Sequence, residues 1–194
     1  MTKRRWREGV GLTALNALAA LSTRGFSISQ EAMQQGIALV RWPARLEWAG
    51  NVLLDGGHNP QCIEALVKNI DDYLAGRPLT VLTGVLGDKD FHCMYANVAP
   101  FAKEFITVTP GQETITITPD SPRAMQGERL AELLRQLGKP AQYAPGIHEA
   151  MQLAQQKVGL EGVVLVAGSL YLAGAVRTEL GLPWSSDVQN YVLG

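Results

Sequence analysis

The sequence lacks the features that mark membrane-spanning, secreted and nucleic-acid-binding proteins. None of its apolar runs approaches the ~20 residues that a membrane-spanning helix needs, and it does not open with a basic segment, an apolar stretch and a small-residue cleavage site. Its formal net charge of -1 leaves no excess of Lys and Arg to neutralise nucleic-acid phosphates. We therefore expect a cytoplasmic protein with neither a membrane nor a nucleic acid as partner.

Cysteine is also scarce, which limits the kinds of cross-link and metal site that the chain can form. The two cysteines, Cys62 and Cys93, each fall inside a predicted helix, and no metal-ligand spacing surrounds them. We expect buried free thiols rather than a disulfide, and no metal site.

The usual nucleotide-binding loops are missing. Neither G-x-x-x-x-G-K-[ST] nor G-x-G-x-x-G occurs anywhere in the sequence. A nucleotide would therefore have to be held jointly with another body of protein, or not at all.

The pattern that is present is that of an α/β protein, and it begins after Trp42-Pro43. Short runs rich in Val, Leu, Ile and Thr alternate with helix-length segments, which predicts βαβ units in a parallel sheet covered on both faces. We predict a doubly wound, mostly parallel, Rossmann-like α/β domain over residues 41–194. The expected strands lie within residues 51–55, 79–85, 104–110, 141–144 and 162–168, and the helices within 60–76, 90–102, 122–138, 146–159 and 169–180.

Two segments fit this pattern less simply. Residues 1–40 are expected to be helical, with two helices separated by a turn at Arg24-Gly25 and with Ser29 as an N-cap. Two helices of about ten residues are marginal in water, so this segment should belong to, or dock on, a larger body. ITVTP at 106–110 is nearly repeated as ITITP at 115–119, which fits either an edge hairpin or a loop with an extra strand.

The stretch LLDGGHNP, residues 53–60, is the main candidate site. Asp55 ends a predicted strand and so lies at the carboxyl edge of the sheet, where open parallel sheets bind ligands. Two glycines allow a sharp turn, and Asn59 and Pro60 are typical first residues of a helix. The start of that helix, beside Asp55 and His58, is suited to an anion. The same pattern also occurs in α/β proteins that bind nothing there.

Two further strand ends carry candidate residues. GVLGDKD places Lys89 at the edge as a contact for an anion, with Asp90 as a helix cap or a ligand. VAGSLYL places Ser169 at a strand-to-helix turn, as an N-cap, a ligand hydroxyl or both. His92 and His148 fall near helix starts and are expected to be surface or capping residues.

Five ordered motifs together resemble one family. They are RWPARLEW, LLDGGHNP, GVLGDKD, TPDSPRAM and GSLYLAGAVR. In this order they are similar to the C-terminal domain of folylpolyglutamate synthase/dihydrofolate synthase, a member of the Mur ligase superfamily, over about residues 25–180. Residues 1–40 resemble the end of the family's central ATPase domain, which is otherwise missing.

The resemblance implies an activity. The family joins glutamate to a folate or pteroate through an acyl phosphate made from ATP, releasing ADP and phosphate. The phosphate loop and most of the magnesium ligands belong to the central domain, so this chain alone should be inactive. We expect ATP, glutamate, the folate or pteroate and the ATPase domain as its partners.

The resemblance also implies roles for individual residues. Arg45 and Asp55 would contact ATP; a guanidinium suits phosphate oxygens, whereas a carboxylate suits ribose hydroxyls or a cation. His58 and Ser169 would help to place glutamate or the acyl phosphate, largely by positioning and charge stabilisation. In the family, an ATP-contacting Asn stands where this chain has Thr13.

Two other functions remain open. A stand-alone binding module without catalysis would account for the missing phosphate loop and for Thr13. A muramyl-peptide ligase domain of the same superfamily is the other, although GSLYL and DSPRAM are of the folate type.

Overall fold

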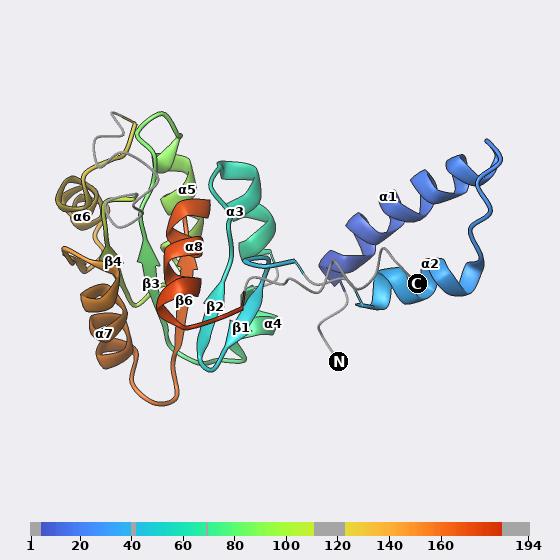
Figure 1. Ribbon diagram of the computed structural model, residues 1–194. Helices are drawn as coiled ribbons and strands as arrows, with labels where there is room; N and C mark the ends of the chain where they lie inside the picture. Colours follow the sequence, from blue (N-terminus) through green and yellow to red (C-terminus); the bar gives the residue numbers. More distant parts are fainter. Residues whose placement is uncertain (1–4, 40–41, 69, 111–122, 184–194) are drawn as a thin grey trace. The chain divides into compact units, whose positions relative to one another are not determined.

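The computed structural model describes residues 5–39, 42–68, 70–110 and 123–183, which fall into two compact units that divide after Trp42 (Figure 1). The ITITP copy at 115–119 lies outside these ranges, as does part of the predicted turn before it. Within them, no helix is both long and apolar enough to cross a membrane.

The first unit consists of two helices, α1 (Arg5–Ser22) and α2 (Gln30–Leu39), as the sequence predicts. The Ser29 hydroxyl accepts the Ala32 N–H at 3.1 Å, so Ser29 is the N-cap of α2. None of the side chains described in this unit is buried. Among the described side chains, six large apolar ones are exposed: Leu12, Leu15, Leu21, Phe26, Leu39 and Trp42. These described side chains therefore form no core of their own.

The second unit is built on a six-stranded sheet in the order β1-β2-β6-β3-β4-β5. The strands are β1 (Glu47–Ala49), β2 (Val52–Leu54), β3 (Leu79–Thr83), β4 (Glu104–Thr107), β5 (Ala141–Tyr143) and β6 (Val163–Ala167). All neighbours are parallel except β1 and β2, which are antiparallel. The prediction of a mostly parallel α/β sheet is confirmed. The edge strand β1 was not predicted, because three residues are too few to show a strand pattern.

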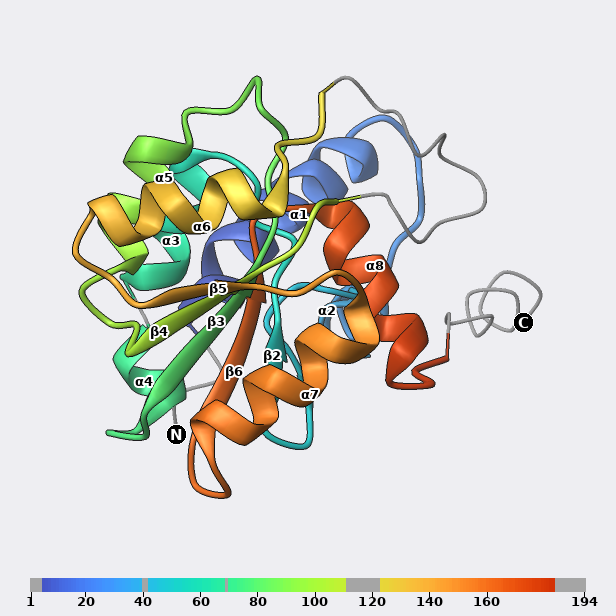
Figure 2. The ribbon, with the colours of Figure 1, turned by 90° about the vertical axis from the view of Figure 1, so that its left-hand side faces the viewer.

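Helices cover both faces of the sheet (Figure 2). One buried cluster joins the sheet to α3 (Pro60–Val67), α4 (Ile70–Leu74), α5 (Phe91–Val98) and α6 (Gly127–Gln136). The other joins it to α7 (Ile147–Val158) and α8 (Leu170–Glu179). Successive strand residues alternate between the clusters: in β6, Leu165 packs in the first and Val166 in the second. This explains why the central strands are apolar at nearly every position.

The last strand of the chain, β6, lies between β2 and β3. This order is a topological switch point, beside which open α/β sheets bind ligands. Because the three strands are parallel, their carboxyl ends lie at the same edge. The loops that carry LLDGGHNP, GSLYL and GVLGDKD therefore leave the sheet side by side.

The prediction of buried thiols is wrong for both cysteines. Cys93 is exposed and Cys62 is half-buried, and both are free. Cys93 lies in the first turn of α5, whose buried residues are Met94, Tyr95 and Val98. The thiol therefore falls on the solvent side of an otherwise well-packed helix.

Two buried threonines of β3 should respond in opposite directions to the same substitution. The Thr83 hydroxyl donates to the Ala167 carbonyl at 2.7 Å and is paired with the Tyr95 hydroxyl at 2.8 Å. The Thr80 hydroxyl is equally buried but has no hydrogen-bond partner within the described residues. We expect Thr83→Val to lower the free energy of unfolding by about 2 kcal/mol, because it leaves buried polar groups unpaired. Thr80→Val should raise it by about 1 kcal/mol, because it removes an unpaired hydroxyl.

Urea denaturation of the two variants and the parent chain measures both effects. Losses of equal size at Thr80 and Thr83 would contradict this account, since they would mean that shape and not hydrogen bonding decides the outcome.

Candidate functional site

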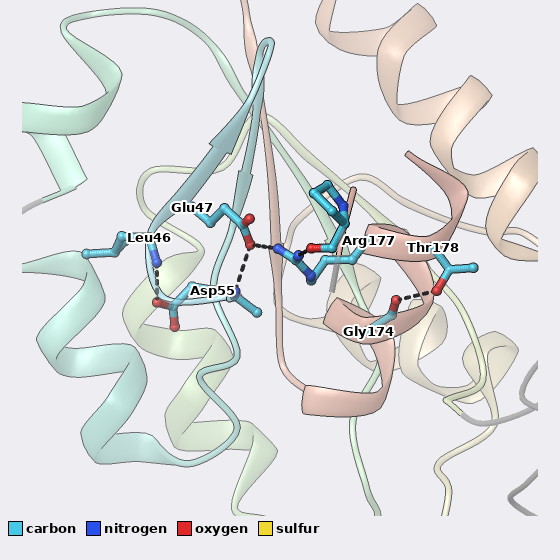
Figure 3. Close-up of polar contacts among 8 residues, drawn as sticks. Leu46, Glu47, Asp55, Gly174, Arg177 and Thr178 are labelled. Carbon is cyan, nitrogen blue, oxygen red and sulfur yellow. Dashed lines mark hydrogen bonds and ion pairs between the residues drawn. The ribbon is translucent and has the colours of Figure 1, made fainter. Parts of the chain in front are cut away.

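Asp55 follows β2 directly and joins three segments of the chain. Its N–H donates to the Val166 carbonyl at 2.9 Å, which extends the pairing of β2 with β6 by one residue. Its carboxylate accepts the Gly57 N–H at 2.8 Å through Oδ1. It also accepts the Leu46 N–H at 3.2 Å through Oδ2 (Figure 3). One buried carboxylate thus holds both the diglycine turn and the loop that carries Arg45.

The diglycine turn brings the Arg45 loop and the end of β6 together. The Gly56 N–H donates to the Ala44 carbonyl, and the Gly168 N–H donates to the Gly57 carbonyl, each at 2.7 Å. A Cβ placed on Gly56 would lie 3.3 Å from Nη1 of Arg45, so the guanidinium packs against the turn. Glycine at position 56 permits this close approach.

His58 lies at the end of the same turn and is half-buried. Its Nδ1 is 2.9 Å from the Gly56 carbonyl. A carbonyl oxygen can only accept, so Nδ1 donates in this contact, and the other ring nitrogen, Nε2, has no hydrogen-bond partner among the described residues. Asn59 then accepts the Cys62 N–H at 2.8 Å and Pro60 opens α3, which confirms the predicted helix start.

Ser169 is the N-cap of α8, as one of its two predicted roles requires. Its hydroxyl accepts the Tyr171 N–H at 3.2 Å, and the residue is almost completely buried. It follows Gly168, whose N–H is bonded to the diglycine turn. Ser169 is therefore close in structure to Asp55 and His58, although more than a hundred residues separate them.

Lys89 lies on the next loop along the sheet edge, after β3. Its Nζ is 3.9 Å from an Asp88 carboxylate oxygen, which also pairs with Arg123. The bond from Arg123 is the largest cause that lowers the pKa of Asp88. Asp90 caps α5 by accepting the Cys93 N–H at 3.1 Å. No hydrogen bond or ion pair of the described residues joins Lys89 to the other four candidates.

Sequence reasoning missed an ion pair beneath the Arg45 loop. Arg177 of α8 is almost fully buried and pairs with Glu47 of β1 (Figure 3). A charged residue in the apolar stretch that contains Ala173 and Val176 was the signal that could have revealed it, because a buried Arg requires a partner. Its partner is 130 positions away, which no local pattern indicates.

The pKa of Asp55 predicts a pH dependence of stability. Burial raises this pKa above the ordinary 3.8, and the N–H bonds from Gly57 and Leu46 and the charges of Arg45 and His58 only partly offset that effect. The folded state then binds the proton more tightly than the unfolded state, so the contribution of Asp55 to stability falls as pH rises from about 4 through the folded pKa.

We expect the difference in unfolding free energy between the parent chain and Asp55→Asn to shrink over this range, because asparagine does not titrate. Urea denaturation at a series of pH values measures that difference. A difference that grows between about pH 4 and pH 7 would mean that the folded pKa is lowered instead.

The described residues do not form a metal site. No group of three His, Cys, Asp or Glu side chains lies close enough together to hold an ion within these ranges. Asp55 is the one acid among the candidates Arg45, Asp55, His58 and Ser169, and each of its carboxylate oxygens accepts a backbone N–H.

Comparisons with known proteins agree on one family. The family described as Mur ligase, glutamate ligase domain, matches residues 44–170. Folylpolyglutamate synthase of Lacticaseibacillus casei is 32% identical over 157 residues, which are 79% of this chain and 33% of that protein.

Two kinds of solved structure have the same fold as this chain. Crystal structures of Mycobacterium tuberculosis folylpolyglutamate synthase with ADP and AMPPCP align with a TM-score of 0.71 and 28% identity, over 83% of this chain and 37% of theirs. A bifunctional folylpolyglutamate synthase/dihydrofolate synthase with Mn, AMPPNP and L-glutamate bound aligns at 0.70 and 27%, over 86% and 38%.

The chain thus spans about a third of the length of these relatives. The family match covers the sheet and every turn that carries a candidate residue, from the Arg45 loop to the start of α8. The resemblance seen in the five motifs is confirmed, and this chain belongs to the family of Mur ligase glutamate ligase domains.

Proposed function

We propose that this chain is the C-terminal part of an ATP-dependent, ADP-forming ligase that adds glutamate to reduced folates. The observation that supports this most is the convergence of Arg45, Asp55, His58 and Ser169 at the carboxyl ends of two adjacent parallel strands. The described residues include no phosphate loop, so the site would be one wall of a larger site that the ATPase part completes.

In this proposal Arg45 and Asp55 face the nucleotide. The Arg45 guanidinium lies against the diglycine turn and supplies a charge matched to phosphate oxygens. Both Asp55 oxygens already accept an N–H, which leaves one lone pair on each for a ribose hydroxyl. A ribose hydroxyl or a cation can each use these lone pairs, so both remain partners of Asp55 in this proposal.

His58 and Ser169 serve the second half of the reaction in the same proposal. In the first half, a folate carboxylate attacks the γ-phosphate of ATP and ADP leaves; in the second, the glutamate amine attacks the acyl phosphate and phosphate leaves. Nε2 of His58 and the hydroxyl hydrogen of Ser169 are proposed to meet the reacting atoms, since Nδ1 and one of the two Oγ lone pairs have internal partners. Lys89, on the adjacent loop, belongs with Arg45 and Asp55 as a nucleotide-binding residue, because its ammonium offers a charge for phosphate oxygens.

The first unit fits the end of an ATPase domain. None of its described side chains is buried and six large apolar ones are exposed, as expected of a fragment whose packing partner is elsewhere. Magnesium would be held by that partner and by the phosphates, because the residues described here do not provide a ligand cluster.

The test is a ligase assay on this chain joined to, or mixed with, the ATPase part of a relative such as the Lacticaseibacillus casei synthase. Release of ADP that depends on both glutamate and a reduced folate or pteroate supports the proposal. If no ADP is released in a glutamate-dependent way with any of these acceptors, the proposal is wrong. Muramyl-peptide acceptors in the same assay separate the folate ligase from the muramyl-peptide ligase.

A second candidate is a binding module that kept this fold and lost catalysis. The missing phosphate loop and Thr13, at the position of an expected ATP-contacting Asn, favour it. Calorimetry with the ATPase part present distinguishes the two. If neither ATP nor glutamate binds, the result counts against the ligase and favours a binding module for a different ligand.

A further inference from the structure

The loop that carries Arg45 has an unusual backbone. Ala44 and Leu46, the residues on either side of Arg45, have φ angles of 53° and 48°. Residues with a side chain adopt this left-handed conformation only at some cost, and they keep it where surrounding contacts impose it. Two such residues around one arginine indicate that the structure fixes the direction in which Arg45 leaves the chain.

Each of the two left-handed residues is held by a different carboxylate. The Ala44 N–H donates to Oε2 of Glu47 at 2.8 Å, and the Leu46 N–H donates to Oδ2 of Asp55 at 3.2 Å. Hydrogen bonds from a backbone N–H to an ionised carboxylate are among the stronger ones in proteins. The loop is thus tied to β1 on one side and to the end of β2 on the other.

Glu47 is itself fixed by Arg177, in the last turn of α8. The guanidinium pairs with the Glu47 oxygen that accepts the Ala44 N–H, and it donates to the Pro183 carbonyl at 2.7 Å (Figure 3). A buried ion pair is weak evidence for stability, because removing charges from water is expensive. It is better suited to holding a particular geometry, and here the geometry is that of the Arg45 loop.

We propose that Glu47 and Arg177 are positioning residues for the nucleotide contact of Arg45, a role that rests on the proposed function. In this proposal both residues act through the Arg45 loop and not by contact with the nucleotide. The last turn of α8 carries Arg177, which holds the Arg45 loop in place through Glu47. The first turn of the same helix follows its N-cap, Ser169. One helix therefore fixes the positions of two candidate site residues, Arg45 and Ser169, relative to each other.

A double-mutant cycle on the full chain tests the proposal. ATP is the probe, and its Kd is measured from amide NMR shifts with the ATPase part of the Lacticaseibacillus casei synthase present, for the parent chain, Glu47→Gln, Arg45→Ala and the double variant. Glu47→Gln keeps the shape of the side chain and removes its charge. Glu132→Gln is the matched control, because Glu132 pairs with Arg129 at 3.0 Å on the exposed face of α6.

We expect Glu47→Gln to raise the Kd for ATP about 5- to 10-fold when Arg45 is present and less than about 2-fold in the Arg45→Ala background. Arg177→Met should behave like Glu47→Gln, and Glu132→Gln should change nothing. A role in stability alone would lower the urea midpoint and give the same loss in both backgrounds. Equal losses, or no loss in either, overturn the proposal.

Hydrogen exchange at the amides of Ala44 and Leu46 separates this proposal from the proposed function. If the parent chain binds no ATP with the ATPase part present, the nucleotide role of Arg45 fails. Faster exchange at Ala44 in Glu47→Gln would then still support the fixing of the loop by the ion pair. Unchanged exchange at both amides in Glu47→Gln would overturn it, whatever ATP does.

Discussion

Replacing Gly168 by alanine is expected to lower the free energy of unfolding by about 3 kcal/mol or more. Gly168 has a φ of +113°, which residues with a side chain rarely adopt. A Cβ would lie 2.6 Å from the Thr83 hydroxyl oxygen and 2.8 Å from the Gly84 carbonyl oxygen. Neither atom can easily move, since one is backbone and the other is bonded to Tyr95 and Ala167.

Urea denaturation of Gly168→Ala against Gly138→Ala isolates the packing part of this loss. Gly138 also has a positive φ, of 77°, but no atom lies within 4 Å of a Cβ built there. Its substitution should therefore lower the unfolding free energy by only about 1 kcal/mol, from backbone strain alone. Similar losses at the two glycines would show that the close approach at Gly168 contributes nothing.

The same substitution should disturb the candidate site. Gly168 donates its N–H to the diglycine turn and precedes Ser169, so a shift of this backbone moves two of the site's turns at once. The residues that close the core at the end of β6 also set the site's geometry. Stability and site geometry are therefore expected to be lost together at this position.

The local parts of this architecture could be read from the sequence because their causes are local. Asn59, Asp90 and Ser169 cap helices that begin within three residues of them, and proline opens α3. The central strands could be predicted for the same reason. Both of their faces are buried, so each strand is a run of residues that are apolar at almost every position. Caps, turns and buried strands each leave a signal within a few residues.

The parts that depend on distant contacts were not predicted. No residue near β6 indicates that it lies between β2 and β3, yet this placement brings Ser169 to Asp55. The edge strand β1 is a partner of β2 across the two-residue turn Gly50-Asn51, and its three residues show no period. The roles of Glu47 and Asp55 in fixing backbone N–H groups became visible only with the fold.

Arg45→Ala is expected to have the largest effect on activity. When the chain is joined to the ATPase part of a relative, this variant should lower kcat/KM for ATP by about 10- to 100-fold. This is the loss expected when a hydrogen-bonded charge is removed from phosphate oxygens. Its effect on kcat/KM for glutamate, measured at saturating ATP, should be less than about 3-fold, because glutamate acts after the nucleotide is in place.

Arg45→Lys is the informative control, because it keeps the positive charge and removes the planar fork of donors. An ammonium meets phosphate as a point charge, so this variant should recover part of the ATP use and leave a deficit. Full recovery would mean that charge alone matters and that the fixed direction of the loop does not. Equal losses for ATP and glutamate in Arg45→Ala would contradict a nucleotide contact. A selective loss with partial rescue is what a guanidinium held in one direction between two left-handed residues should produce.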